Sequence, residues 1–141
     1  MDLDNPVVKL CVAGMRAEGE NRFEDARRLF NQAWETSRDD FEACISAHYL
    51  ARHQDNPQDT LRWNQEALAR ANAVGDERVS GFYPSLYLNL GHSYETLGNL
   101  EEAARLYGLA SQGMGQLPDG RYSGIVRSAV EAGKKRIQNK P

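Results

Sequence analysis

The sequence is poor in cysteine. Its only two cysteines, Cys11 and Cys44, lie far apart, each inside an apolar stretch with helical spacing. Two isolated cysteines cannot form the framework of a disulfide-rich domain. We expect both to be reduced and buried as small apolar side chains. A disulfide or a reactive thiol is the alternative.

Long apolar runs are also missing. No stretch approaches the roughly 20 apolar residues of a membrane-spanning helix. Residues 1–6 are acidic and polar, without the basic and apolar segments of a secretory signal. The net charge of −3 gives no electrostatic reason to expect nucleic acid or an anionic membrane as a partner. We therefore expect a cytoplasmic protein that binds neither.

The residues of common catalytic and metal sites are few. The histidines are His48, His53 and His92, and no two of them have the spacing that places two metal ligands on one helix face. No glycine-rich phosphate loop follows a strand pattern. His92 and Glu95 are three residues apart, a spacing more typical of a surface hydrogen bond than of an acid–base pair. We expect no metal, no cofactor and no enzymatic activity, although a nucleophile and base distant in sequence remain an open alternative.

Helical spacing of apolar residues is abundant. It runs through the whole chain, and no segment alternates with the period of a strand. An all-α fold of about seven helices follows. Their expected ranges are 6–18, 23–37, 40–54, 57–74, 78–97, 100–115 and 119–137.

The clearest local pattern lies within residues 87–107. An aromatic residue is followed by leucine, glycine and a second aromatic, and after a turn by alanine and a third aromatic. These residues are Tyr87, Leu90, Gly91, Tyr94, Ala103 and Tyr107, with Gly98 and Asn99 at the turn. The pattern resembles the tetratricopeptide repeat, a helix–turn–helix unit of about 34 residues.

An earlier copy of this pattern begins near residue 7. Gly14 stands for Gly91, Asn21 for the turn residue Gly98, Ala26 for Ala103 and Phe30 for Tyr107. Ala33 stands for Ala110, which follows Tyr107 by three residues. The resemblance therefore covers more than one part of the chain.

The middle copy departs from the pattern. Ala67 follows Ala33 by 34 residues, but Asn64 replaces the aromatic and His48 replaces the glycine. A small residue normally lets the two helices approach. We therefore expect a wider or rotated helix pair here, with Trp63 filling the space.

The spacing of the copies defines the domain organisation. Ala110 follows Ala67 by 43 residues, nine more than one repeat. We assign repeats to residues 7–40, 41–74 and 84–117, an insertion to 75–83 and a capping helix to 119–137, all in one domain. The resemblance implies a right-handed α–α superhelix of three hairpins and a cap.

The resemblance also implies where a partner binds. In this family the first helix of each repeat lines the concave surface. The candidate partner-binding residues are Met15, Tyr49, Arg52, His53, Asn89, His92 and Glu95. Tyr49, Arg52 and His53 share a helical face, and Arg52 can hold a carboxylate or a phosphate. The alternative for these three is a solvated face with local salt bridges.

Two family features refine the expected ligand. An asparagine at the position of Asn89 often bonds to the main chain of an extended peptide. The family's basic clamp for the acidic C-terminus of chaperones is absent, because only Asn89 of its matching positions fits.

Three functional hypotheses remain. The first is an interaction module that binds a peptide or partner-protein segment in the concave groove. The second is a self-assembling structural protein, with a homodimer as its simplest form, because the open edge of the first repeat has no preceding cap. A small-molecule-binding or enzymatic protein is a distant third.

Overall fold

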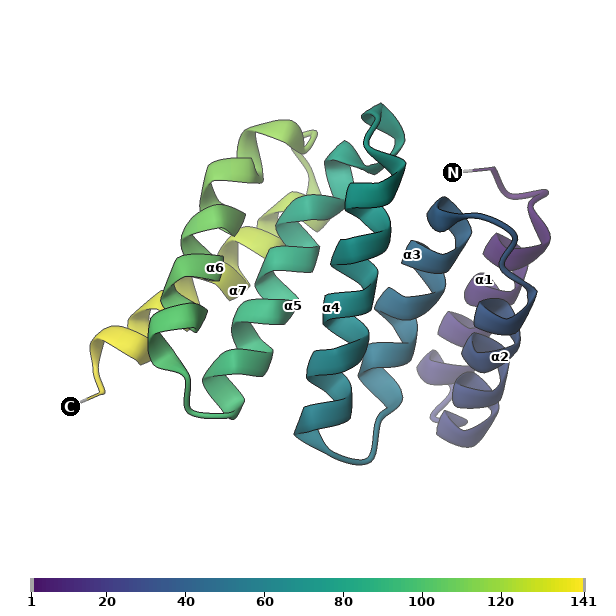
Figure 1. Ribbon diagram of the computed structural model, residues 1–141, viewed down its shortest axis with the longest axis horizontal. Coiled ribbons are helices and arrows are strands. Elements are labelled where there is room, and N and C mark those ends of the chain that lie inside the picture. The colour runs from purple at the N-terminus through teal and green to yellow at the C-terminus, as the bar shows by residue number, and fades with distance from the viewer. Residues whose placement is uncertain (1, 141) are drawn as a thin grey trace. The chain divides into compact units, whose positions relative to one another are not determined.

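The computed structural model describes residues 2–140, apart from the side chain of Gln116, and within this range the chain forms seven α-helices and no strand (Figure 1). The all-α class is therefore confirmed. The helices are α1 (Pro6–Gly19), α2 (Phe23–Thr36), α3 (Asp40–Leu50), α4 (Pro57–Val74), α5 (Tyr83–Thr96), α6 (Leu100–Gln112) and α7 (Arg121–Gln138). Short 3-10 segments are η1 (Ala51–His53), η2 (Glu77–Phe82) and η3 (Gly113–Gln116). No helix in the described range has the length and apolar character needed to cross a bilayer.

The chain divides into two compact units, which we call the N-terminal unit (residues 1–74) and the C-terminal unit (residues 75–141). The N-terminal unit contains the helical pairs α1–α2 and α3–α4, and the C-terminal unit contains the pair α5–α6 together with α7. The boundary falls at the start of the predicted insertion. Gly75 has a φ of +65°, a left-handed conformation that ends α4 at low steric cost.

Helix ends follow local sequence signals. The side chain of Asn5 accepts hydrogen bonds from the amides of Val7 and Val8 and so caps α1. Asn56 accepts one from the amide of Asp59 at the start of α4, as expected for an N-cap before Pro57.

The turns of the first and last helical pairs share one backbone device. Asn21, between α1 and α2, has a φ of +62°, and Gly98, between α5 and α6, has a φ of +86°. Asparagine and glycine are the residues that adopt this left-handed conformation most readily. Asn21 and Gly98 are the two turn residues that the repeat pattern predicts to be equivalent.

A glycine against an aromatic ring sets the close approach within these two pairs. A Cβ atom at Gly14 would lie 2.4 Å from the ring of Phe30, and one at Gly91 would lie 2.9 Å from the ring of Tyr107. Phe30 and Tyr107 are both fully buried. In each pair the missing side chain makes room for the ring of the second helix.

The α3–α4 pair replaces this contact. Asn64 is buried where the other pairs have an aromatic ring, and Trp63 lies instead against Trp34 of α2, with ring centroids 4.9 Å apart in an edge-to-face arrangement. Trp63 therefore joins α4 to α2.

His48 takes the place of the glycine in this pair. Burial lowers the pKa of His48 to about 4, with a smaller contribution from Arg52.

The predicted fifth helix, residues 78–97, is divided in two. Asp76 caps η2 through the amide of Arg78, and α5 begins only at Tyr83. Pro84 explains the division, because a proline ring inside a continuous α-helix clashes with the carbonyl four residues earlier. The third predicted helix likewise ends early, at Leu50, and continues as η1.

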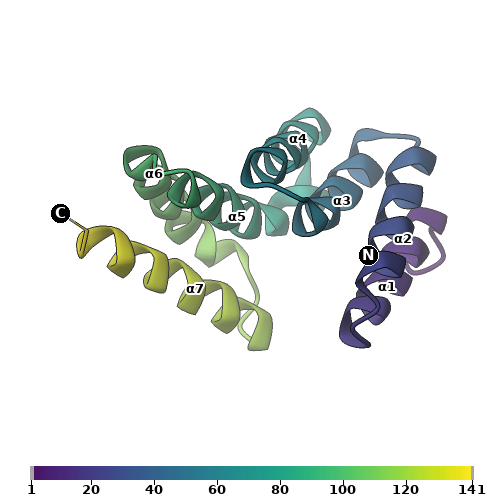
Figure 2. The same ribbon diagram turned by 90° about the horizontal axis from the view of Figure 1, so that it is seen from below.

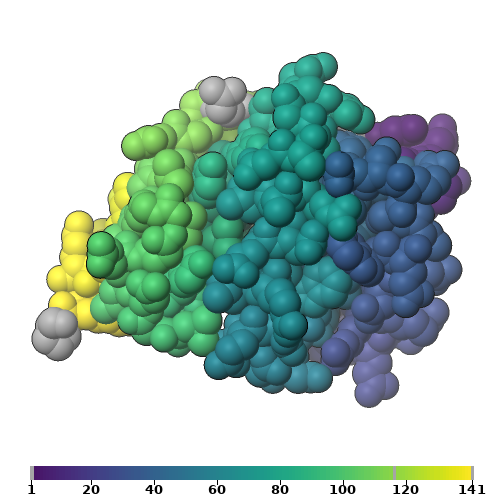
Figure 3. All heavy atoms as spheres, viewed as in Figure 1, coloured from purple at the N-terminus to yellow at the C-terminus, as the bar shows by residue number. Residues whose placement is uncertain are grey.

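Helix α7 packs against both α5 and α6 in the C-terminal unit (Figure 2). Its buried stripe consists of Ser123, Val126, Val130 and Gly133. A Cβ atom at Gly133 would lie 2.5 Å from the ring of Tyr107, so this ring is in contact with glycines of both α5 and α7. Side chains fill the space between the ribbons of α5 and α6 (Figure 3).

Candidate partner-binding surfaces

In the N-terminal unit, the side chain of Glu18 ties the end of α1 to the segment that follows α3. One carboxylate oxygen accepts a hydrogen bond from Nη2 of Arg52 at 2.8 Å, and the other lies 2.7 Å from Nε2 of His53. We call this set the Glu18 junction. It places two of the predicted partner-binding residues around one carboxylate.

Aromatic rings extend the Glu18 junction. The Arg52 guanidinium lies 4.7 Å from the centroid of the Tyr49 ring, in a cation–π arrangement. Tyr49 in turn stacks on Phe30 with a ring-centroid separation of 5.1 Å. The centroid of the His53 ring lies 5.4 Å from that of Phe30. Tyr49, Arg52 and His53 therefore lie close together in the structure, although α3 ends at Leu50 and the last two belong to η1.

The members of this junction differ in accessibility. The Arg52 side chain is 45% exposed, whereas that of His53 is 11% exposed. A guanidinium carries five N–H donors, and the bond to Glu18 uses one of them. Arg52 is thus held in place from one side and open to solvent on the other.

Met15, the predicted partner-binding residue of α1, is partly exposed one turn before Glu18. Cys11, one turn earlier, is buried as expected. Cys11 is buried because α1 packs against α3. Near the other end of the same two helices, Asn5 donates a hydrogen bond from Nδ2 to the buried carboxylate of Glu42 at 2.8 Å.

The C-terminal unit repeats the carboxylate tie with Glu95. Its carboxylate accepts hydrogen bonds from the hydroxyl of Tyr107 at 2.7 Å and from Nε of Arg136 at 2.8 Å, and Nζ of Lys140 lies 3.9 Å away. We call this set the Glu95 junction. The hydrogen bond from Arg136 is the main reason why the pKa of Glu95 is lowered to about 2. Burial opposes this shift, and the hydrogen bond from Tyr107 adds to it.

The other predicted residues of α5 lie beside this junction. His92 is exposed and Asn89 is half-buried. Within residues 2–140, the carboxylate oxygens of Glu95 bond to Tyr107 and Arg136 and not to His92. The structure therefore places His92 and Asn89 on accessible parts of α5, and Glu95 in an internal tie.

The role of Glu18 and Glu95 as internal ties was not evident from the sequence. Each glutamate follows a glycine of the repeat pattern by four residues, Gly14 in one case and Gly91 in the other. This equal spacing was a usable signal, because equivalent positions of a repeat occupy equivalent surroundings.

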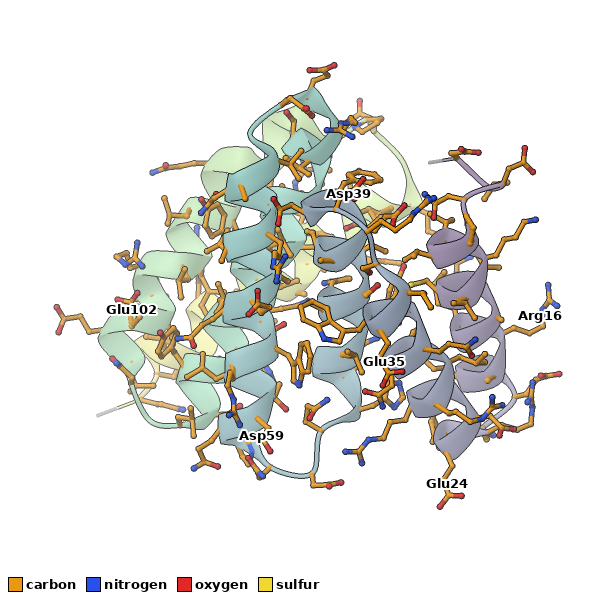
Figure 4. All side chains as sticks on the ribbon, turned by 45° about the vertical axis from the view of Figure 1, so that its right-hand side comes forward. Arg16, Glu24, Glu35, Asp39, Asp59 and Glu102 are labelled. Atoms are coloured by element: carbon orange, nitrogen blue, oxygen red, sulfur yellow. The ribbon has the colours of Figure 1, made fainter. Side chains whose placement is uncertain are left out.

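A shallow depression lies at the turn between α2 and α3, and the protein's own cations line it. Its lining residues are Trp34, Glu35, Ser37, Arg38, Asp39, Asp40, Ala43 and Arg70. The Arg70 guanidinium lies 5.3 Å from the Trp34 ring and bonds to Asp40 at 3.0 Å. Figure 4 shows Glu35 on α2 and Asp39 at the start of α3, on this side of the N-terminal unit.

The remaining reactive groups are inaccessible. Cys11 and Cys44 are free thiols and both are buried, which confirms the expected environment; burial raises the pKa of each to about 12. Among residues 2–140, no three histidine, cysteine or acidic side chains lie close enough together to hold a metal ion.

Comparison with protein-family models, curated proteins and solved structures gives no match to this chain.

Proposed function

We propose that this chain is a tetratricopeptide-like interaction module that binds a peptide or a partner-protein segment on the faces of its first-of-pair helices. The observation that carries the proposal is Arg52, which is half-exposed yet fixed between the Glu18 carboxylate and the Tyr49 ring. Arginine and tyrosine are enriched among the residues that dominate binding energy. A side chain fixed before binding loses less conformational entropy on association.

The repeated elements of the two units support the same proposal. Gly14 with Phe30 and Gly91 with Tyr107 make equivalent contacts, and the glutamate four residues after each glycine ties its helix to a later segment. In a tetratricopeptide-like chain these first helices line a concave surface. A right-handed superhelix and a cytoplasmic location belong to the proposal.

The test compares two arginines whose side chains are equally exposed and paired with a carboxylate. The purified chain is used to capture a partner from cells, and the dissociation constant of the identified partner is then measured. Arg52→Ala should weaken binding about tenfold or more, as expected at a central binding residue. Arg27 of α2 is the control, because its side chain is 44% exposed and also pairs with a carboxylate, that of Asp55.

The control separates loss of binding from loss of folding. Arg27→Ala should leave the dissociation constant within about twofold, since surface ion pairs contribute little. Thermal denaturation followed by circular dichroism shows whether both variants remain folded. Equal effects of the two substitutions would count against a binding role for this face.

Self-assembly is the second candidate, favoured by exposed apolar side chains at the N-terminal end. Leu3 and Phe23 are both more than half exposed, and Val12 and Met15 are partly exposed. If these exposed side chains join two copies, light scattering will show a mass that rises with concentration, and Phe23→Ser will lower that mass. A constant monomer mass removes this candidate.

A further inference from the structure

Helix α7 has a charge opposite in sign to that of the whole chain. Its 18 residues contain five basic side chains and one acidic side chain, whereas the chain has a net charge of −3. Such a concentration of positive charge attracts acidic partners and raises their association rate.

Some of these cations are already neutralised within the C-terminal unit. Arg136 pairs with Glu95, and Lys134 lies 3.9 Å from Glu131. Arg121 and Lys135 are exposed, and neither forms an ion pair among the described residues. Their charges are therefore available to a ligand.

A second, exposed apolar stripe runs along the same helix beside the buried one. Tyr122 is 51% exposed and Ile125 is 60% exposed, and Ala129 and Ala132 continue the stripe at spacings of four and three residues. Spacings of three and four residues place these side chains on one face. Because its later members are alanines, a partner backbone can approach this face closely.

A hydrogen bond holds Tyr122 of the exposed stripe in place, and two unpaired cations flank the stripe. The hydroxyl of Tyr122 is hydrogen-bonded to that of Ser85 on α5, which orients the ring. Arg121 precedes Ile125 by four residues and Lys135 follows Ala132 by three, so both cations lie next to the stripe. We call Arg121, Tyr122, Ile125, Ala132 and Lys135 the α7 surface.

We infer that the α7 surface docks an acidic segment of a partner protein whose apolar side chains cover Tyr122 and Ile125. The inference rests on the proposed interaction function and names the chemistry of the partner. Charge complementarity selects the acidic segment, and the apolar stripe fixes its position. A membrane is less suited to this surface, because interfacial helices insert several bulky apolar side chains and this stripe offers only two.

The test uses a fluorescein-labelled glutamate peptide that carries two leucines one helical turn apart, with anisotropy as the readout. The full chain should bind it, with an affinity that falls as salt is added. Ile125→Ser should weaken binding about tenfold through loss of apolar contact. The double variant Arg121→Glu, Lys135→Glu should abolish binding, because both flanking charges then repel the acidic peptide.

Matched controls lie on α1 of the N-terminal unit. Val12→Ser replaces a partly exposed apolar side chain, and Lys9→Glu reverses an exposed lysine. Both should leave the affinity for the peptide unchanged, and a peptide with lysines in place of glutamates should not bind. Circular dichroism establishes that the α7 variants keep their helical content.

Several outcomes overturn the inference. These are failure of the glutamate peptide to bind, equal loss in the α1 controls, and binding of anionic lipid vesicles without binding of the peptide. A captured partner whose affinity responds to Arg52→Ala but not to Ile125→Ser also overturns it while leaving the proposed function intact. If the affinity of a captured partner responds to Ile125→Ser but not to Arg52→Ala, the inference stands and the assignment of the Arg52 face fails.

Discussion

Glu95 joins the end of α5 to the last turns of α7 through Arg136, whose Nε lies 2.8 Å from a carboxylate oxygen. At the opposite ends of these helices, Tyr122 bonds to Ser85. The start of α7 therefore meets the start of α5 and its end meets the end of α5, so the two helices run parallel. The pair α1 and α3 has the same arrangement, with Asn5 and Glu42 at one end and Glu18 and Arg52 at the other.

The first prediction concerns the strength of this tie. Glu95→Gln should lower the free energy of unfolding by about 1–3 kcal/mol, because a hydrogen-bonded carboxylate that is only 9% exposed loses its charge-assisted bonds. Glu102→Gln is the control, since Glu102 pairs with Arg105 on the exposed side of a single helix. Its effect should be clearly smaller than that of Glu95→Gln, because water screens an exposed ion pair. Urea denaturation gives both values, and equal losses would contradict the internal role of Glu95.

The second prediction concerns the glycine contacts of Tyr107. Gly133→Ala should destabilise the protein by about 1–3 kcal/mol, because the new methyl group would overlap the ring. Gly108→Ala, in the middle of α6 with no atom within 4 Å of its Cβ position, should stabilise it by about 0.5–1 kcal/mol. The sign of the difference in melting temperature is the measurement. Stabilisation by both substitutions would show that the ring is free to move away.

The third prediction is that stability falls in two stages as the solution is acidified. The pKa of His48 is near 4 in the folded protein against an ordinary 6.5, so the unfolded chain binds the additional proton between these values. Hydrogen bonds, chiefly from Arg38, lower the pKa of Glu42 to about 2 against an ordinary 4.5. Stability is therefore lost first as pH falls from 6.5 to 4, and then from 4.5 to 2.

Two substitutions separate these stages. His48→Gln should flatten the dependence of unfolding free energy on pH in the upper range, and Glu42→Gln should flatten it in the lower range. Urea denaturation at a series of pH values gives the slopes. An unchanged slope above pH 4.5 in the His48 variant would contradict the assignment of that stage to this ring.

The fourth prediction concerns the thiols. Because burial raises the pKa of Cys11 and Cys44 to about 12, neither should react with an aromatic disulfide reagent in the native protein at neutral pH. Both should react rapidly in denaturant, and slow native reaction should follow the rate of opening. Immediate modification of either thiol in the native protein would contradict its burial.

Helical periodicity and local signals were sufficient to predict the seven α-helices, but not the 3-10 segments. Asn56 with Pro57, Gly75 with Asp76, and Gly98 mark helix ends that the structure confirms. Boundaries were least accurate where an α-helix changes into a 3-10 segment, at Leu50 and before Tyr83. The two helix types have similar backbone angles, and segments as short as η1 and η2 do not show their own side-chain period.

The candidate surfaces were only partly predictable for a different reason. Spacing placed Tyr49, Arg52 and His53 on one face, but it did not show that Glu18 would face Arg52. It likewise did not show that α3 would cover Cys11, or that Ile125 would remain exposed while Val126 became buried. Which neighbour covers a helix face depends on contacts between residues distant in the chain.

By itself, the amino-acid sequence determined the all-α class, the seven helices, their main turns and the small residues at which the first and last pairs approach. These features follow from local backbone preferences and from the period of the apolar residues. Only the tertiary structure decided that Glu18 and Glu95 are internal ties, that Trp63 packs on Trp34, and that α7 keeps an exposed apolar stripe among its cations. These depend on how whole helices pack against one another, which a single sequence leaves undetermined.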